Sequence, residues 1–168
     1  SQIGKTAYGP DFSSAPSKSY ILDSLDICQE GDSGLLEVPP TIITKSSILQ
    51  KFPTLGKKIY HYNKYKAIAF ASKILNFTPF WFRPFPQTTA KNLIDVYHHA
   101  KMLNSDYIEL MFHSSELMPG GSPYNQNQQD IDNLYEKLKI LFEFLEKEQC
   151  QGIPLMDYAK RCSQHNKN

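Results

Sequence analysis

Residues 107–124 have the sequence YIELMFHSSELMPGGSPY, in which an apolar segment runs into a loop rich in glycine and proline. The first six residues are mostly apolar or aromatic and predict a short β-strand, whereas PGGSP at 119–123 predicts a turn. His113 stands where this strand ends. Reactive side chains gather at strand ends in parallel α/β folds, so His113 is our candidate general acid or base. The alternative is a histidine that caps the strand and bonds a loop carbonyl.

The residues after His113 include further candidates but do not form a simple catalytic dyad. His113 and Ser114 are adjacent, so along a strand they point to opposite sides and are not a Ser–His pair by themselves. Gly120 and Gly121 can bring backbone N–H groups close to a ligand, or they can simply turn the chain. The sequence leaves both interpretations open.

Farther from this loop, two stretches show helical spacing behind a capping residue. A threonine at 88 or 89 can cap a helix that extends to residue 103. Asn127 can cap a second helix, whose apolar residues recur over 131–145. Weaker helical character is present at residues 46–52 and 64–75.

Strands complete the expected organisation. One strand is expected at residues 35–44, interrupted or bent by Pro39 and Pro40, and short strands are expected at 107–112 and 153–156. The order strand, helix, strand, long loop, helix, strand predicts an α/β fold with parallel strands. Residues 1–34 are expected to be largely irregular, and residues 1–168 to form a single domain.

Composition excludes several classes of protein. Of the 168 residues, 40% are hydrophobic and 12% aromatic, which is too many for a disordered chain. The net charge of +1 provides no basic excess for binding nucleic acid, and no apolar run is long enough to span a membrane. The three cysteines are far apart and indicate free thiols or at most one pair, which favours a reducing, cytoplasmic location.

Two further sets of residues can be interpreted as functional or as structural. Arg83 lies in the aromatic run WFRPFP at 81–86, where a guanidinium can stack and hold a carboxylate or a sugar, or can pair structurally. His98 and His99 are about 100° apart around the expected helix, so they cannot both face one metal ion. No HExxH or HxxxH spacing is present, and solvated helix positions are the favoured interpretation.

One run of the sequence also resembles a known family. The run MFHSSELMPGGSPY at 111–124 resembles a segment of the polysaccharide deacetylases, the NodB-homology carbohydrate esterases of family 4. In particular, it resembles the branch associated with bacterial surface-polysaccharide biosynthesis. YGPDF at 8–12, GDSGLLEVP at 31–39 and WFRPFP at 81–86 extend the similarity over nearly the whole chain.

The resemblance implies a fold and a set of roles. Members have a distorted (β/α) barrel and remove acetyl groups from sugars with a divalent metal such as zinc. The family's late motif maps onto Met111, which would line the acetyl pocket, and His113, which would protonate the leaving group. Trp81, Arg83, Ser114, Gly120 and Gly121 are the further candidates for substrate binding. The family's metal ligands come from earlier motifs that this sequence lacks, so the chain is expected to correspond to the carboxyl-terminal half of such a barrel.

Two functions are therefore expected as alternatives. In the first, a longer parent protein hydrolyses an acetyl group from a polysaccharide or glycolipid sugar, and this chain alone is inactive. In the second, the chain is a non-catalytic carbohydrate-binding or assembly module without a metal site. The missing amino-terminal half or a second copy is the expected protein partner, because a half barrel exposes strand edges and apolar surface.

Overall fold

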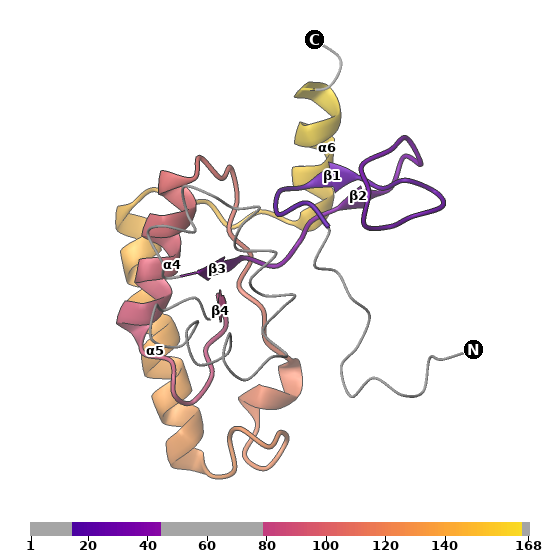
Figure 1. The fold of residues 1–168 in the computed structure, drawn as a ribbon. Coiled ribbons are helices and arrows are strands. Elements are labelled where there is room, and N and C mark those ends of the chain that lie inside the picture. Colours follow the sequence, from indigo (N-terminus) through magenta and orange to yellow (C-terminus); the bar gives the residue numbers. More distant parts are fainter. Residues whose placement is uncertain (1–14, 45–78, 166–168) are drawn as a thin grey trace, which may run out of the picture.

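The computed structural model describes residues 15–44 and 79–165 (Figure 1). The weak helical predictions at 46–52 and 64–75 lie outside these ranges. The described elements, in chain order, are β1 (Tyr20–Ile21), β2 (Leu36–Glu37), β3 (Ile42–Thr44), β4 (Pro79–Trp81), α4 (Ala90–Met102), the 3₁₀ turn η1 (Ser114–Leu117), α5 (Gln128–Lys147) and α6 (Leu155–His165).

The two long helices begin at capping residues that the sequence identifies. The Thr89 hydroxyl accepts a hydrogen bond from Asn92 N, and the Asn92 side chain accepts one from Thr89 N. Asn127 and Asp130 form the same reciprocal arrangement at the start of α5. Each arrangement satisfies N–H groups that a helix otherwise leaves without partners, which explains where the helices start. Both helix predictions are confirmed.

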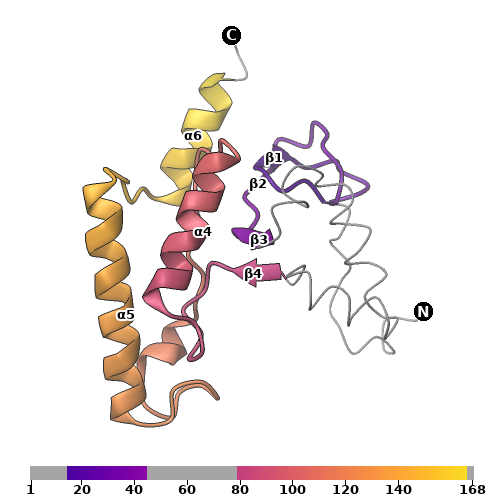
Figure 2. The ribbon, with the colours of Figure 1, turned by 60° about the vertical axis from the view of Figure 1, so that its left-hand side comes forward.

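The helices form two layers against a short pair of strands. In Figure 2, α4 lies between α5 on one side and β3 and β4 on the other. The core is made by one side chain of β3, the residue that directly follows β4, two side chains of α4 and one of α5: Ile43, Phe82, Leu93, Val96 and Leu141. Leu93, Val96 and Leu141 are completely buried, as their spacing on amphipathic helices predicts.

The described strands pair in two antiparallel ladders. In the first, Tyr20 of β1 lies opposite Glu37 of β2; in the second, Ile42 of β3 lies opposite Trp81 of β4. The strand predicted over 35–44 is found as two short strands, β2 and β3, which lie on either side of the two prolines and belong to different ladders. The described residues leave the larger parallel barrel untested, and it stays a prediction.

Two other strand predictions differ from the structure. Residues 107–112 are extended, but no ladder is formed within the described part of the chain; Met111 N donates to Phe82 O at 3.2 Å and Glu109 N to the Thr41 hydroxyl at 2.8 Å. The prediction of a strand at 153–156 is wrong, because α6 starts at Leu155. Pro154 O accepts from the N–H groups of Asp157 and Tyr158, so this short apolar run opens a helix.

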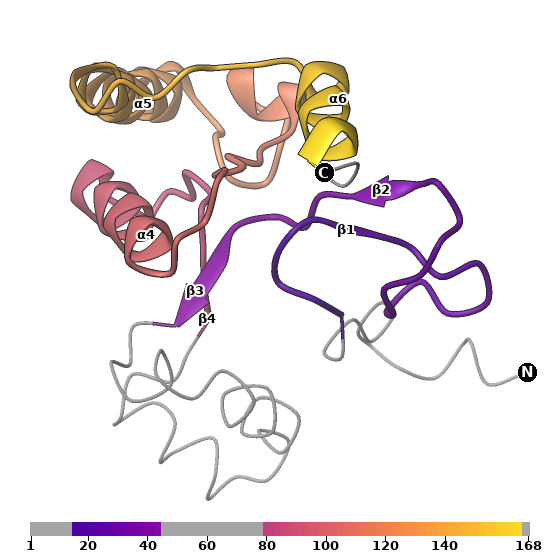
Figure 3. The ribbon, with the colours of Figure 1, turned by 90° about the horizontal axis from the view of Figure 1, so that it is seen from above.

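The last helix is linked to the amino-terminal strands. Figure 3 shows α6 beside the part of the chain that carries β1 and β2. The Tyr158 and Ser19 hydroxyls are hydrogen bonded at 2.8 Å, and the Tyr158 hydroxyl donates to Asp106 Oδ2 at 3.0 Å. The sequence predicts largely irregular structure over residues 1–34, yet their described part contains β1. None of the helices in the described ranges is long and apolar enough to cross a membrane.

Candidate functional site: the His113 loop

His113 lies at the end of the extended 107–112 segment, and its side chain is exposed. It is the residue immediately before η1, with an extended backbone at φ −90° and ψ 145°. The backbone N–H of His113 donates to Glu116 Oε1 at 3.2 Å, and the backbone N–H of Glu116 donates to the His113 carbonyl at 2.9 Å. The backbone of His113 is therefore held at both ends by one residue of the following turn.

Glu116 is the residue around which this loop is organised. It is only 2% exposed, and its Oε1 also accepts from Arg83 Nη2 at 2.5 Å. Asn125 Nδ2 donates to the Glu116 carbonyl at 2.7 Å from the far side of the loop. Sequence reasoning did not single out Glu116 or Asn125. In the string His-Ser-Ser-Glu, Glu116 stands three positions after His113. At this spacing a glutamate side chain can accept a hydrogen bond from the backbone N–H of the residue before a helical turn, so the spacing could have identified Glu116.

Arg83 is buried in a mostly aromatic setting. Its guanidinium carbon lies 4.6 Å from the centre of the Phe85 ring and 5.5 Å from that of Tyr124. Its Nε is buried and makes no hydrogen bond among the described residues. The sequence indicates either a substrate-binding or a structural role for Arg83. In the structure its guanidinium donates to Glu116 and makes cation–π contacts with Phe85 and Tyr124.

The segment around Arg83 is also tied to α5. Lys137 Nζ donates to the carbonyl of Phe85 at 2.6 Å. Burial lowers the pKa of Lys137 below its ordinary value, because the charged ammonium is partly removed from water. The ammonium group of Lys137 on α5 thus holds the backbone close to Arg83. No sequence pattern predicted this interaction.

The backbone N–H groups of the two glycines donate hydrogen bonds to carbonyls within the same loop. Gly120 N donates to Asn125 O at 2.9 Å, and Gly121 N donates to Met118 O at 3.0 Å. Gly120 has φ +72°, and a Cβ at Gly121 would collide with the carbonyl oxygen of Ser115. Both backbone N–H groups are used within the loop, so this geometry favours the turn interpretation over ligand binding.

The remaining predicted site residues are Met111, Ser114 and Trp81, and they differ in exposure and in position relative to Arg83 and the His113 loop. Met111 is half-buried, and its N–H bonds to the backbone of Phe82, the neighbour of Arg83. Ser114 is exposed at the first position of η1. Trp81 is 40% exposed at the end of β4, two positions before Arg83. The structure thus brings Arg83, Met111 and the loop from His113 to Gly121 together, with Trp81 nearby along the chain.

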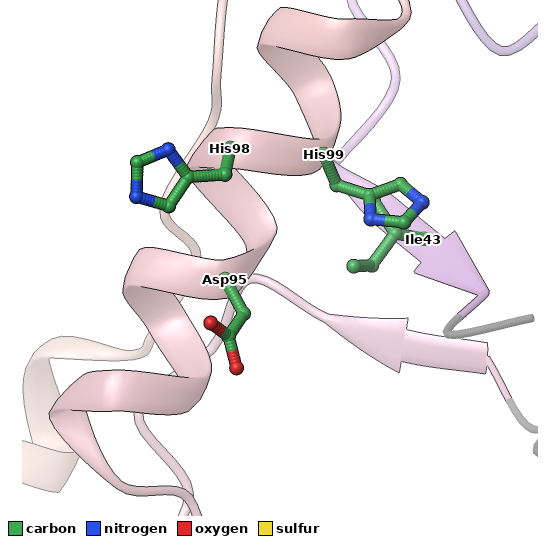
Figure 4. A pocket seen from close by; sticks show the side chains of 4 residues that line it. All are labelled: Ile43, Asp95, His98 and His99. Carbon is green, nitrogen blue, oxygen red and sulfur yellow. The ribbon is translucent and has the colours of Figure 1, made fainter. Parts of the chain in front are cut away.

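A shallow hollow of about 340 Å³ lies away from the loop, on α4 beside β3. Figure 4 shows Asp95, His98 and His99 around it with Ile43, and the two imidazoles point in different directions from the helix, in keeping with the angle of about 100° between adjacent helix positions. His98 is exposed, whereas His99 is half-buried and its Nε2 makes no hydrogen bond within the described ranges. Burial lowers the pKa of His99, an effect that Asp95 partly opposes.

The described ranges contain His, Cys, Asp and Glu side chains, the types that ligate divalent metals. In residues 15–44 and 79–165, no group of three or more His, Cys, Asp or Glu side chains is arranged to hold a metal ion. These side chains therefore do not fit the divalent metal that the resemblance implies. Comparisons with protein-family models, with curated proteins and with solved structures found no match to this chain.

Proposed function

We propose that this chain supplies the leaving-group acid of a carbohydrate deacetylase that acts as part of a longer protein. The observation that carries the proposal is the placement of the MFHSSELMPGGSPY run. His113 is exposed at the start of a loop whose backbone is held by the buried pair of Arg83 and Glu116. An imidazole on a firmly held backbone, open to solvent, suits a group that must meet a substrate and transfer a proton.

The chemistry assigned to this chain is limited to the second half of hydrolysis. After water has added to the acetyl carbonyl, the bond from the carbonyl carbon to the sugar nitrogen or oxygen breaks. His113 donates a proton to that departing atom, so the products are acetate and a free amine or hydroxyl. Because the described residues do not fit a divalent metal, we assign no step to a metal held by them. Met111, half-buried two residues earlier, would contact the acetyl methyl group.

The test is the substitution His113→Ala in the protein expressed from its natural reading frame. Acetate release from a panel of N- and O-acetylated oligosaccharides would be followed by NMR. We expect kcat to fall by about 10²–10⁴-fold, the usual contribution of a general acid. His98→Ala is the matched control, because it removes an exposed histidine outside the loop and should retain turnover. Unchanged turnover in His113→Ala would contradict the proposal.

A second function is favoured by one specific observation, the exposed indole of Trp81. Tyr124 is also about as exposed, at 39% against 40% for Trp81, and aromatic rings of this kind stack on sugars. A carbohydrate-binding module without its own metal ligands would use such rings. In that case Trp81→Ala would weaken oligosaccharide binding by this chain, measured by calorimetry, whereas His113→Ala would not. Acetate release by the purified chain with added Zn²⁺ would overturn this alternative.

A further inference from the structure

We propose that Arg83 and Glu116 are positioning residues, which hold His113 at the place where its imidazole meets the leaving group. The inference rests on the proposed function and adds a role for two residues that contact no substrate in it. Arg83 was a candidate for substrate binding, and Glu116 was not a candidate at all.

Two consecutive residues, Phe82 and Arg83, hold the chain on both sides of His113. Phe82 O accepts from Met111 N at 3.2 Å, two residues before the histidine. Arg83 bonds the carboxylate of Glu116, three residues after it. The histidine therefore lies on a short arc of chain whose two ends are attached to the same segment, Phe82 and Arg83, which directly follows β4.

One carboxylate oxygen links Arg83 to the backbone of His113. Glu116 Oε1 accepts from Arg83 Nη2 and also from the backbone N–H of His113. The guanidinium is planar and directional, so the place of Arg83 determines the place of this oxygen, and the oxygen determines that of the His113 backbone. Asn125 holds the Glu116 backbone from the opposite side, which leaves the turn little freedom.

The energetics of the buried ion pair also favour a positioning role. A buried ion pair is a costly way to stabilise a fold, because apolar residues of similar volume often do as well or better. Arg83 is 8% exposed and Glu116 is 2% exposed, so both charges are removed from water. What the pair provides and an apolar pair does not is the oxygen that fixes His113. The position of His113 is important for proton transfer, because a misplacement of about 1 Å can lower the rate about 100-fold.

The test separates positioning from stability with the double variant Arg83→Met/Glu116→Met. It removes both buried charges together, so we expect the thermal midpoint to stay close to that of the wild type. We expect kcat to fall by about 10- to 100-fold with KM unchanged. We also expect the imidazole signals of His113, narrow and single in the wild-type NMR spectrum, to broaden or split. Arg83→Lys, which keeps the cation and loses the planar group, should show the same changes in weaker form.

Glu148→Gln is the matched control. It removes a carboxylate that accepts hydrogen bonds from Lys101 and Tyr97 at the other end of the helix pair. Kinetics and His113 signals should match those of the wild type in this variant. Wild-type kcat together with unchanged His113 signals in either Arg83 variant would overturn the inference. The NMR readout needs no turnover, so if His113→Ala leaves acetate release intact, the proposed function fails while the effect of the ion pair on His113 is still measured.

Discussion

Gly120 and Gly121 are adjacent in the loop after His113, but each is required there for a different reason. Gly120 has φ +72°, a conformation that costs L-residues about 1–2 kcal/mol. At Gly121 the obstacle is a backbone oxygen, that of Ser115, which cannot move without opening the turn. We expect Gly120→Ala to lower the free energy of unfolding by about 1–2 kcal/mol and Gly121→Ala by about 1–3 kcal/mol, both measured by urea denaturation.

Gly152 is the control for these substitutions. Its added Cβ would meet no atom within 4 Å, so Gly152→Ala should change the free energy of unfolding by less than about 0.5 kcal/mol. Equal losses at all three glycines would show that the local geometry described for the loop is wrong.

His99 makes stability depend on pH. Burial lowers the pKa of its imidazole in the folded state, while Asp95 acts in the opposite direction. The unfolded chain therefore binds a proton more readily, so the neutral form stabilises the fold above the ordinary pKa of about 6.5. That stability is lost as the pH falls through the lowered folded pKa. We expect the urea midpoint to fall from pH 7.5 to pH 5.5 by more in the wild type than in His99→Gln.

The control for this comparison is His98→Gln, which changes an exposed neighbour on the same turn of α4. Its midpoints should follow those of the wild type at both values of pH. An identical pH dependence in wild type and His99→Gln would mean that the folded environment does not disfavour the charged imidazole.

Among the secondary-structure elements, α5 shows how sharply one helix separates its two faces. Leu141 is completely buried against α4 and the strands, whereas its neighbour Phe142 is 52% exposed. We expect Leu141→Ala to cost about 2–5 kcal/mol in unfolding free energy, because it leaves a cavity in the core. Phe142→Ala removes more atoms, but from an exposed side chain, so it should lower the free energy of unfolding by less than about 1 kcal/mol. Circular dichroism during urea denaturation measures both, and a reversed order would contradict the described packing.

The sequence predicted the elements whose signals are local. Thr89 and Asn127 cap helices through hydrogen bonds within three residues, and the helical period of the apolar residues agrees with the burial of Leu93, Val96 and Leu141. The run 153–156 has no such signal. Three apolar residues and one proline suit a strand or the first turn of a helix equally, and contacts made by Tyr158 favour the helix.

Across the chain as a whole, Tyr158 joins three distant parts of the sequence. Its hydroxyl contacts Ser19, 139 residues away, and Asp106, 52 residues away. Burial raises its pKa, and Asp106 adds to the effect. We expect Tyr158→Phe to lower the free energy of unfolding by about 0.5–1.5 kcal/mol, the net value of a hydrogen bond.

The loss should also be visible locally, as faster hydrogen exchange in α6 and in the segment around β1. Tyr135→Phe removes the hydroxyl of an exposed tyrosine on α5 and should leave exchange in α6 unchanged. Unaltered exchange in Tyr158→Phe would mean that packing, and not this hydroxyl, attaches the last helix.

The sequence alone predicts the two long helices, their capping residues, their buried faces and the turn at PGGSP. It also identifies His113 as the candidate general acid or base. These features depend on periodicity and on contacts within a few residues, which the sequence records directly. Two other features emerge only from the packed chain: Arg83 pairs with Glu116, 33 residues away, and His99 is half-buried while His98 is exposed. The pairing of a buried charge depends on which segments the core brings together, and no local pattern contains that information.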